Sequence, residues 1–237
     1  MATPPSGPLG TLSRATTPER VAAALTTAIL GRNLPPGAQL VEVDIAAQFG
    51  VSRHTVREAF RILGREGFVE HAPHRGVSVR AFTADEVADI YRVRRLLEVE
   101  GVRMGATATA AAVARVTEAA GRFDLAARRG RWTEGFEADL ALHAGLVALV
   151  GSPTLDALML DLLRSLRLAH YLLPGADAAG FRRSRSQHRD IVRALKARDR
   201  RAARTAVLHH LDDAEALLCS ALREQDGVIS RTAGRTA

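Results

Sequence analysis

The sequence FGVSRHTVREAFRILGR, residues 49–65, decides the fold of the N-terminal part of the chain. Gly50 allows a tight turn and Ser52 is a favourable N-cap, so the pattern predicts a helix over residues 53–65. Helical periodicity gives this helix an apolar face and a cationic face. The apolar face holds Val56, Ala59, Phe60, Ile62 and Leu63, and the cationic face holds Arg53, Arg57, Arg61 and Arg65. We therefore expect one face to pack against a core and the other to meet solvent or an anionic partner.

The segments on either side of this helix predict a winged helix-turn-helix. A helical pattern over residues 17–30 stops at the segment 31–37, which contains two prolines, and a second short helix is predicted over residues 40–49. Residues 68–70 and 77–79 are strand-like pieces on either side of a turn, so they predict a hairpin. Three short helices followed by a hairpin are the elements of a winged domain.

The pattern after residue 80 is helical throughout. Thr83 and Glu86 form a capping box that begins a long amphipathic helix ending near residue 108. Further helices are predicted over residues 110–129, 133–150, 154–172, 181–197 and 199–223. The predicted fold class is therefore mainly α, an N-terminal winged helix-turn-helix followed by an all-helical bundle. The predicted parts are a disordered leader (1–16), a winged helix domain (17–80), a helical bundle (81–225) and a disordered tail (226–237).

The composition excludes several classes of protein. The 237 residues are 47% hydrophobic and 25% charged, which is typical of a soluble globular protein and excludes disorder of the whole chain. The single cysteine, Cys219, cannot form an internal disulfide and is expected in the core rather than as a nucleophile. No stretch approaches the roughly 18 to 20 apolar residues of a membrane span, and residues 1–18 lack a signal-peptide pattern. We expect a cytoplasmic protein with no membrane partner.

The positive charge points to an anionic partner only through its placement. The formal net charge is +7, and every basic residue except Lys196 is an arginine. An arginine fork suits phosphate oxygens and the guanine edge, and the N-terminal part of a helix in the major groove usually contacts the bases. The candidates are Ser52, Arg53, His54, Thr55 and Arg57. The alternative is a solvated face, partly paired with Glu58 and Glu66, but the turn and the wing favour binding of double-stranded DNA.

Four polar side chains fall on apolar stripes of the predicted bundle. Asp139 and His143 share one inward stripe, His188 lies on the stripe of the helix over 181–197, and His210 lies on that of the last helix. Gln187 falls outside its stripe. A carboxylate left unpaired in an apolar interior costs several kcal/mol, so Asp139 needs a partner. A metal ion at the convergence of three helices provides one. The alternatives are hydrogen-bonded core histidines and a self-contained pair of Asp139 with His143.

The first domain resembles that of GntR-type bacterial transcription regulators. The resemblance rests on LPPGAQLVE at 34–42, FGVSR at 49–53, VREA at 56–59, and the pairs Glu66-Gly67 and Arg75-Gly76. It implies that Ser52, Arg53, Thr55 and Arg57 contact the operator, with Arg75 and Gly76 at the tip of the wing. The chain departs from the family at Val43, where a basic residue is usual, and at His54-Thr55, where Thr-Pro is commoner. These departures imply a changed operator sequence.

The second domain resembles the C-terminal ligand-sensing domain, of FCD type, in the FadR-like branch of the same family. The resemblance rests on the spacing of Asp139 and His143, GSPTL at 151–155, His188, and His210-Leu211. It implies a divalent metal ion, zinc, nickel or manganese, held by Asp139, His143, His188 and His210. It also implies a homodimer.

Arg94 is the candidate for binding an effector. It lies on the inward stripe of the first bundle helix, and Arg94 with Glu98 matches the Arg-x-x-x-Glu of the family. A guanidinium beside a metal with one carboxylate ligand suits a small organic acid. The alternative is an internal ion pair of Arg94 with Glu98. The sequence thus predicts a bacterial transcription regulator whose operator binding responds to a small carboxylate, and not an enzyme. The alternative function is a metal-dependent enzyme acting on a small organic acid.

Overall fold

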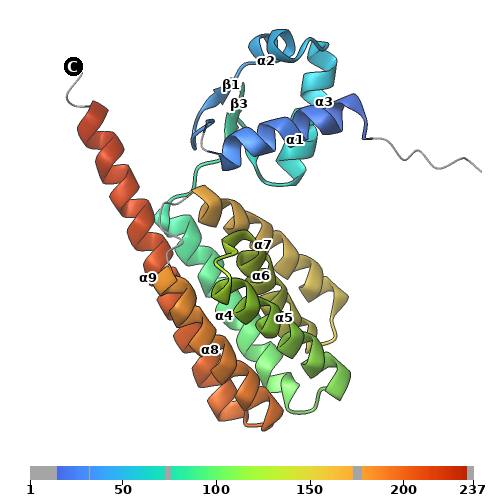
Figure 1. Cartoon of the computed structure of the whole chain (residues 1–237), viewed down its shortest axis with the longest axis vertical. Helices are drawn as coiled ribbons and strands as arrows, with labels where there is room; N and C mark the ends of the chain where they lie inside the picture. The colour runs from blue at the N-terminus through green and yellow to red at the C-terminus, as the bar shows by residue number, and fades with distance from the viewer. Residues whose placement is uncertain (1–14, 32, 73–75, 173–177, 234–237) are drawn as a thin grey trace, which may run out of the picture. The chain divides into compact units, whose positions relative to one another are not determined.

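The computed structural model describes residues 15–31, 33–72, 76–172 and 178–233. The chain divides into two compact units, residues 1–80 and 81–237, and each is described here by itself. Figure 1 shows a small sheet among the helices of the first unit and a bundle of long helices in the second. The prediction of a mainly α chain with a winged helix-turn-helix before an all-helical bundle is confirmed.

The described residues of the first unit form three helices and a three-stranded antiparallel sheet. The helices are α1 (Thr17–Leu30), α2 (Glu42–Phe49) and α3 (Arg53–Arg65), and the strands are β1 (Gln39–Leu40), β2 (Val69–Ala72) and β3 (Gly76–Val79). The strand order is β1-β3-β2, with Leu40 opposite Val77. This pairing corrects the predicted start of the second helix at residue 40. Leu40 belongs to the sheet because it pairs with Val77. This partner is distant in sequence, and local periodicity does not report such a contact.

Helix α3 has the two faces that its sequence predicts. Gly50 ends α2 in the left-handed conformation with φ of 64°, and the hydroxyl of Ser52 accepts a hydrogen bond of 3.1 Å from the backbone N–H of Thr55. The fully buried residues of α3 are Val56, Ala59, Phe60 and Leu63. This face packs against α1, whose own buried residues are Val21, Ala22, Leu25 and Ile29. The arginines of α3 are left on the exposed side.

The described part of the second unit is helical. Its helices are α4 (Ala84–Gly105), α5 (Ala110–Arg128), α6 (Trp132–Ala148), α7 (Pro153–Leu172), α8 (Ala178–Lys196) and α9 (Arg200–Ala233). Helix α4 packs against α6 and α9, and α5 packs against α6 and α8 (Figure 1). Helix α9 continues ten residues beyond the predicted end at residue 223, so it includes residues 226–233 of the predicted tail. The rest of that tail and residues 1–14 of the predicted leader lie outside the described residues.

Gly101 sets the distance between α4 and α6. A Cβ atom at this position would lie 2.1 Å from the carbonyl oxygen of Leu146, so only glycine allows the two backbones to approach this closely. Glu98 and His143 each lie three residues earlier on these helices, which places them on the same contact. The sequence of α4 therefore brings a carboxylate against a histidine of α6.

None of the described helices combines the length and the apolar character that a membrane span requires.

Candidate metal centre and nucleic-acid interface

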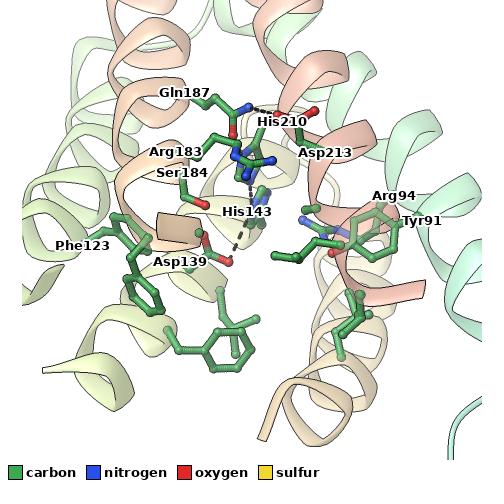
Figure 2. Close-up of a pocket in the computed structure, with 18 of the residues that line it drawn as sticks. Tyr91, Arg94, Phe123, Asp139, His143, Arg183, Ser184, Gln187, His210 and Asp213 are labelled. Carbon is green, nitrogen blue, oxygen red and sulfur yellow. Dashed lines mark hydrogen bonds and ion pairs between the residues drawn. The ribbon is translucent and has the colours of Figure 1, made fainter. Parts of the chain in front are cut away.

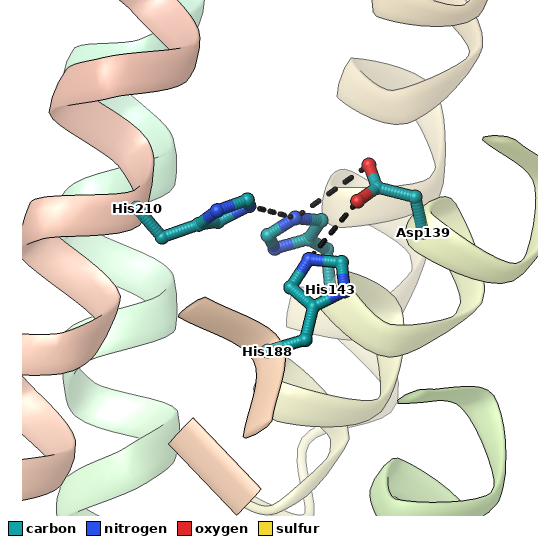
Figure 3. A group of neighbouring side chains, drawn as sticks. All are labelled: Asp139, His143, His188 and His210. Carbon is teal, nitrogen blue, oxygen red and sulfur yellow. Dashed lines mark hydrogen bonds and ion pairs between the residues drawn. The ribbon is translucent and has the colours of Figure 1, made fainter. Parts of the chain in front are cut away.

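The four predicted metal ligands meet inside the second unit. Asp139 and His143 come from α6, His188 from α8 and His210 from α9, and one ligand atom from each lies within 4.8 Å of the others (Figure 3). The three histidines are buried, whereas the side chain of Asp139 is 20% exposed. Burial acts to raise the pKa of Asp139, but the nearby histidines outweigh it and hold the pKa well below its usual range. The group therefore offers an ionised carboxylate and three imidazoles.

Glu98 fixes the protonation of one imidazole ring. Its Oε2 atom lies 2.6 Å from Nδ1 of His143, and its Oε1 atom accepts a 2.8 Å hydrogen bond from Nε of Arg94. Burial acts to raise the pKa of Glu98, but Arg94 and His143 outweigh it and keep the pKa below its usual value. An ionised carboxylate can only accept hydrogen bonds, so Nδ1 of His143 carries the proton. When this ring is neutral, Nε2 of His143 therefore carries a lone pair and can accept a hydrogen bond or bind a metal ion.

Gln187 fixes a second imidazole in the same way. Its amide nitrogen donates to Oδ2 of Asp213 at 2.7 Å, so its amide oxygen is the atom 2.9 Å from Nδ1 of His210. Nδ1 of His210 must then be the donor, and Nε2 of the neutral ring carries a lone pair. Burial, with the charges of His188 and His143, lowers the pKa of His210 well below its usual value. This ring is therefore neutral at pH 7.

The resulting arrangement fits a divalent cation. Nε2 of His143 and Nε2 of His210 are 3.1 Å apart. When both rings are neutral, their two lone pairs face each other and repel unless a cation lies between them. Zinc–nitrogen bonds are about 2.0 to 2.1 Å long, so two ligands on one ion lie about 2.9 Å apart at right angles and about 3.3 Å apart at the tetrahedral angle, and the observed distance falls between these values. His188 strengthens the fit. Its ring nitrogens are buried with no hydrogen bond of good geometry in the described structure, and its Nε2 lies 3.1 Å from Oδ1 of Asp139.

A cavity of about 110 Å³ adjoins this cluster. Asp139, His143 and His210 line it, together with Arg94 and Tyr91 from α4 (Figure 2). Arg94 is 3% exposed, and its guanidinium carbon lies 4.7 Å from the centre of the Tyr91 ring. The ion pair with Glu98 that the sequence left as an alternative is present, but Nη2 of Arg94 is buried with no hydrogen-bond partner. The pair thus leaves one donor of Arg94 unused.

The predicted DNA contacts lie at the start of α3. Ser52, Arg53 and His54 are exposed, and Thr55 is half-buried. Arg57 is exposed, and its Nη1 lies 3.4 Å from Oε2 of Glu42 in α2. Arg61 pairs with Glu58, as the alternative of a solvated face expects. At the wing, Gly76 begins β3 with φ of 79°. The predicted contact Arg75 lies outside the described residues.

Two residues that orient the cluster were not predicted for that role. Glu98 was considered only as the partner of Arg94, but it also contacts His143. Gln187 was placed outside the inward stripe, yet it is 6% exposed and contacts His210. It lies four residues before the fully buried Ile191, and this helical spacing is the signal that identifies it.

Comparisons with known proteins identify the family. Residues 17–79 match the family described as "bacterial regulatory proteins, gntR family", and residues 89–213 match the FCD domain family. The chain belongs to the GntR family. A probable D-xylose utilization operon transcriptional repressor of Paenarthrobacter nicotinovorans is 30% identical over 204 residues, which cover 84% of this chain and 88% of the relative. The gluconate operon transcriptional repressor of Bacillus subtilis is 42% identical over 87 residues, 37% of this chain and 35% of the relative.

A solved structure agrees with this assignment. The crystal structure of a putative transcriptional regulator GntR from Rhodococcus sp. RHA1 is 36% identical, with a TM-score of 0.69 over 86% of this chain and 98% of that one. The resemblance inferred from the sequence is therefore confirmed. The chain is a GntR-family transcriptional regulator with an FCD domain.

Proposed function

We propose that this GntR-family regulator binds operator DNA as a cytoplasmic homodimer, and that a small carboxylate bound beside a metal ion changes its affinity for the operator. The convergence of four possible ligand atoms within 4.8 Å, with Nε2 of His143 only 3.1 Å from Nε2 of His210, is the observation that supports the metal most directly. The unused donor of Arg94 in the same cavity supports the acid.

In this proposal Asp139, His143, His188 and His210 hold a divalent ion, zinc, nickel or manganese. When bound, the ion supplies a positive centre that attracts a carboxylate oxygen. Arg94 donates its free Nη2 to the same carboxylate. Glu98 and Gln187 keep two of the ligands in the tautomer that accepts the ion.

The DNA side of the proposal rests on α3 and the wing. The residues we assign to DNA contact are Ser52, Arg53, His54, Thr55, Arg57, Arg75 and Gly76. Exposed arginines at the N-terminal end of α3 match the geometry of base readout in the major groove. Two of the relatives are named as repressors of the D-xylose and gluconate operons, which supports a response to a small metabolite. We assign the metal centre a sensing role rather than the enzyme activity considered as an alternative.

Gel-shift titration of the promoter DNA of the protein's own gene tests the DNA contacts. We expect Arg53→Ala to weaken specific binding by about fivefold or more, because a bidentate arginine–guanine contact is worth about 1 to 3 kcal/mol. The control is Arg92→Ala, which removes an exposed arginine of α4 that is paired with Asp89. Equal operator affinity of wild type and Arg53→Ala would contradict the assignment of base contacts.

Thermal shift with a panel of carboxylic acids tests the effector site. With zinc present, we expect at least one acid to stabilise the wild type, and we expect Arg94→Met to lose this effect. Arg92→Met is the matched control, because it changes an exposed arginine two residues away. An acid that stabilises both variants as much as the wild type would remove Arg94 from the site.

A further inference from the structure

The wall of the cavity on the Asp139 side is aromatic. The chain has ten aromatic residues, seven Phe, two Tyr and one Trp, and four of them line this cavity. Phe123 from α5, Phe136 from α6 and Phe181 from α8 form the wall, together with Leu140 and Leu166. Figure 2 shows Phe123 beside Asp139, whereas Arg94 and Tyr91 face the cavity from the other side. Phe123 and Arg94 therefore lie on opposite sides of the cavity.

Contacts among aromatic rings hold this wall in place. The rings of Phe123 and Phe181 stack with centroids 5.2 Å apart and an interplanar angle of 2°, and the ring of Trp132 lies 4.8 Å from that of Phe181. Gly135 makes room for this packing, because a Cβ there would lie 2.6 Å from Cε1 of Phe181. The wall begins at the metal centre itself, since the Phe123 ring meets the His188 ring edge-on at 4.5 Å.

We infer that the effector is a monocarboxylic acid with a compact apolar body, either branched alkyl or aryl. The inference rests on the proposed function, which places the carboxylate between Arg94 and the metal cluster. The body of the acid then lies along the aromatic wall, where burial of apolar surface stabilises the complex. The cavity volume of about 110 Å³ is smaller than the roughly 150 Å³ of an engineered cavity that binds benzene. It fits a body of about five or six carbon atoms.

A sugar acid of the same length fits this wall poorly. Its hydroxyl groups would face aromatic rings and leucine side chains, and a buried hydroxyl without a hydrogen-bond partner is costly. Polar side chains also line the cavity, namely Arg183, Ser184 and Asp213, and Figure 2 shows Arg183 and Ser184 on the same side as Asp139. They are the residues on which binding of a sugar acid would depend. The two classes of acid can therefore be separated by experiment.

Calorimetric titration of the zinc-loaded full-length protein with four acids tests the inference. The probes are 4-methylpentanoate and benzoate, with apolar bodies, and gluconate and glutarate, with a hydroxylated chain and a second carboxylate. We expect each of the first two to bind at least tenfold more tightly than either of the last two. If gluconate or glutarate bound as tightly as the apolar acids, the inference of an apolar body would be wrong, but the proposed carboxylate site would still be supported. Failure of all four to bind would overturn both proposals.

Two variants then assign the preference to the wall. Leu166→Asn puts an amide among the apolar residues of the wall. We expect this variant to bind 4-methylpentanoate about tenfold more weakly than wild type, and gluconate as tightly as wild type or more tightly. Arg183→Ala should bind 4-methylpentanoate with an affinity within about twofold of wild type. The reverse pattern, loss of binding in Arg183→Ala alone, would overturn the inference. Because Leu166 is only 3% exposed, the ligand series on wild type provides a test that does not depend on the folding of this variant.

Discussion

Replacing Glu98 by glutamine changes one carboxylate oxygen at the centre of the buried network. The side chain of Glu98 is 0% exposed and accepts from Nε of Arg94 and from Nδ1 of His143. Glutamine has the same shape but only one acceptor oxygen, so its amide nitrogen must face one of these donors. If the oxygen stays with Arg94, His143 must move its proton from Nδ1 to Nε2. That proton would then point at His210, at the position we assign to the metal.

The size of both effects follows from these contacts. Hydrogen bonds to charged groups contribute about 1.5 to 3 kcal/mol each, and Glu98→Gln weakens two of them. We expect the free energy of unfolding of the metal-free protein to fall by about 2 to 3 kcal/mol. Loss of a group that orients a metal ligand typically lowers metal affinity by about 10 to 100-fold. We expect zinc affinity to fall within that range.

Urea unfolding followed by circular dichroism in the presence of EDTA measures the stability, and competition with a chelating dye measures zinc affinity. The matched control is Glu100→Gln, two residues further along α4, where the side chain is exposed and paired with Arg103. An exposed pair of this kind contributes little, so the control should unfold at close to the urea concentration of the wild type. A Glu98→Gln variant that loses stability but keeps zinc affinity within about twofold would refute the orienting role.

Three further changes test the packing, the helix start and the ligands. Gly101→Ala should lower the free energy of unfolding by about 1 to 3 kcal/mol, because its Cβ would lie 2.1 Å from a backbone oxygen of α6. Gly121→Ala, which meets nothing within 4 Å, should be neutral or stabilising in the same urea experiment. Ser52→Ala should cost about 1 kcal/mol through the lost cap and reduce hydrogen-exchange protection at the start of α3; unchanged protection would contradict this. The double variant His188→Ala, His210→Ala should retain no zinc in native mass spectrometry, and unchanged stoichiometry would exclude these ligands.

Helical periodicity is sufficient to predict which four side chains the structure brings together at the candidate metal centre. Asp139, His143, His188 and His210 share stripes with apolar residues, and the structure brings all four together because each stripe faces the bundle interior. Gln187 was missed because it lies at the edge of its stripe, where small errors in helix rotation decide whether a side chain is inside.

Contacts between distant segments were predicted less well. The strand β1 has only two residues, and its pairing with β3 depends on a partner some 40 residues away in sequence. The second contact of Glu98 also crosses from α4 to α6, through the close approach at Gly101. The end of α9 was misplaced for a different reason. Its pattern after residue 223 is polar, and a polar segment gives no periodic signal by which to distinguish helix from tail.

Glu98 joins the two ligands of the proposed sensor. One oxygen of this carboxylate holds Arg94, which has a free donor for the acid, and the other holds His143, which has a free lone pair for the metal. A metal ion and an anion of opposite charge in one cavity attract each other, so each should raise the affinity for the other. By thermodynamic linkage the two factors must be equal, and a coupling of about 1 to 3 kcal/mol is typical of regulated proteins. The arginine that the sequence suggested for an acid and the histidine that it suggested for a metal therefore belong to one hydrogen-bonded unit, and the response of the regulator to an acid should depend on whether the metal is bound.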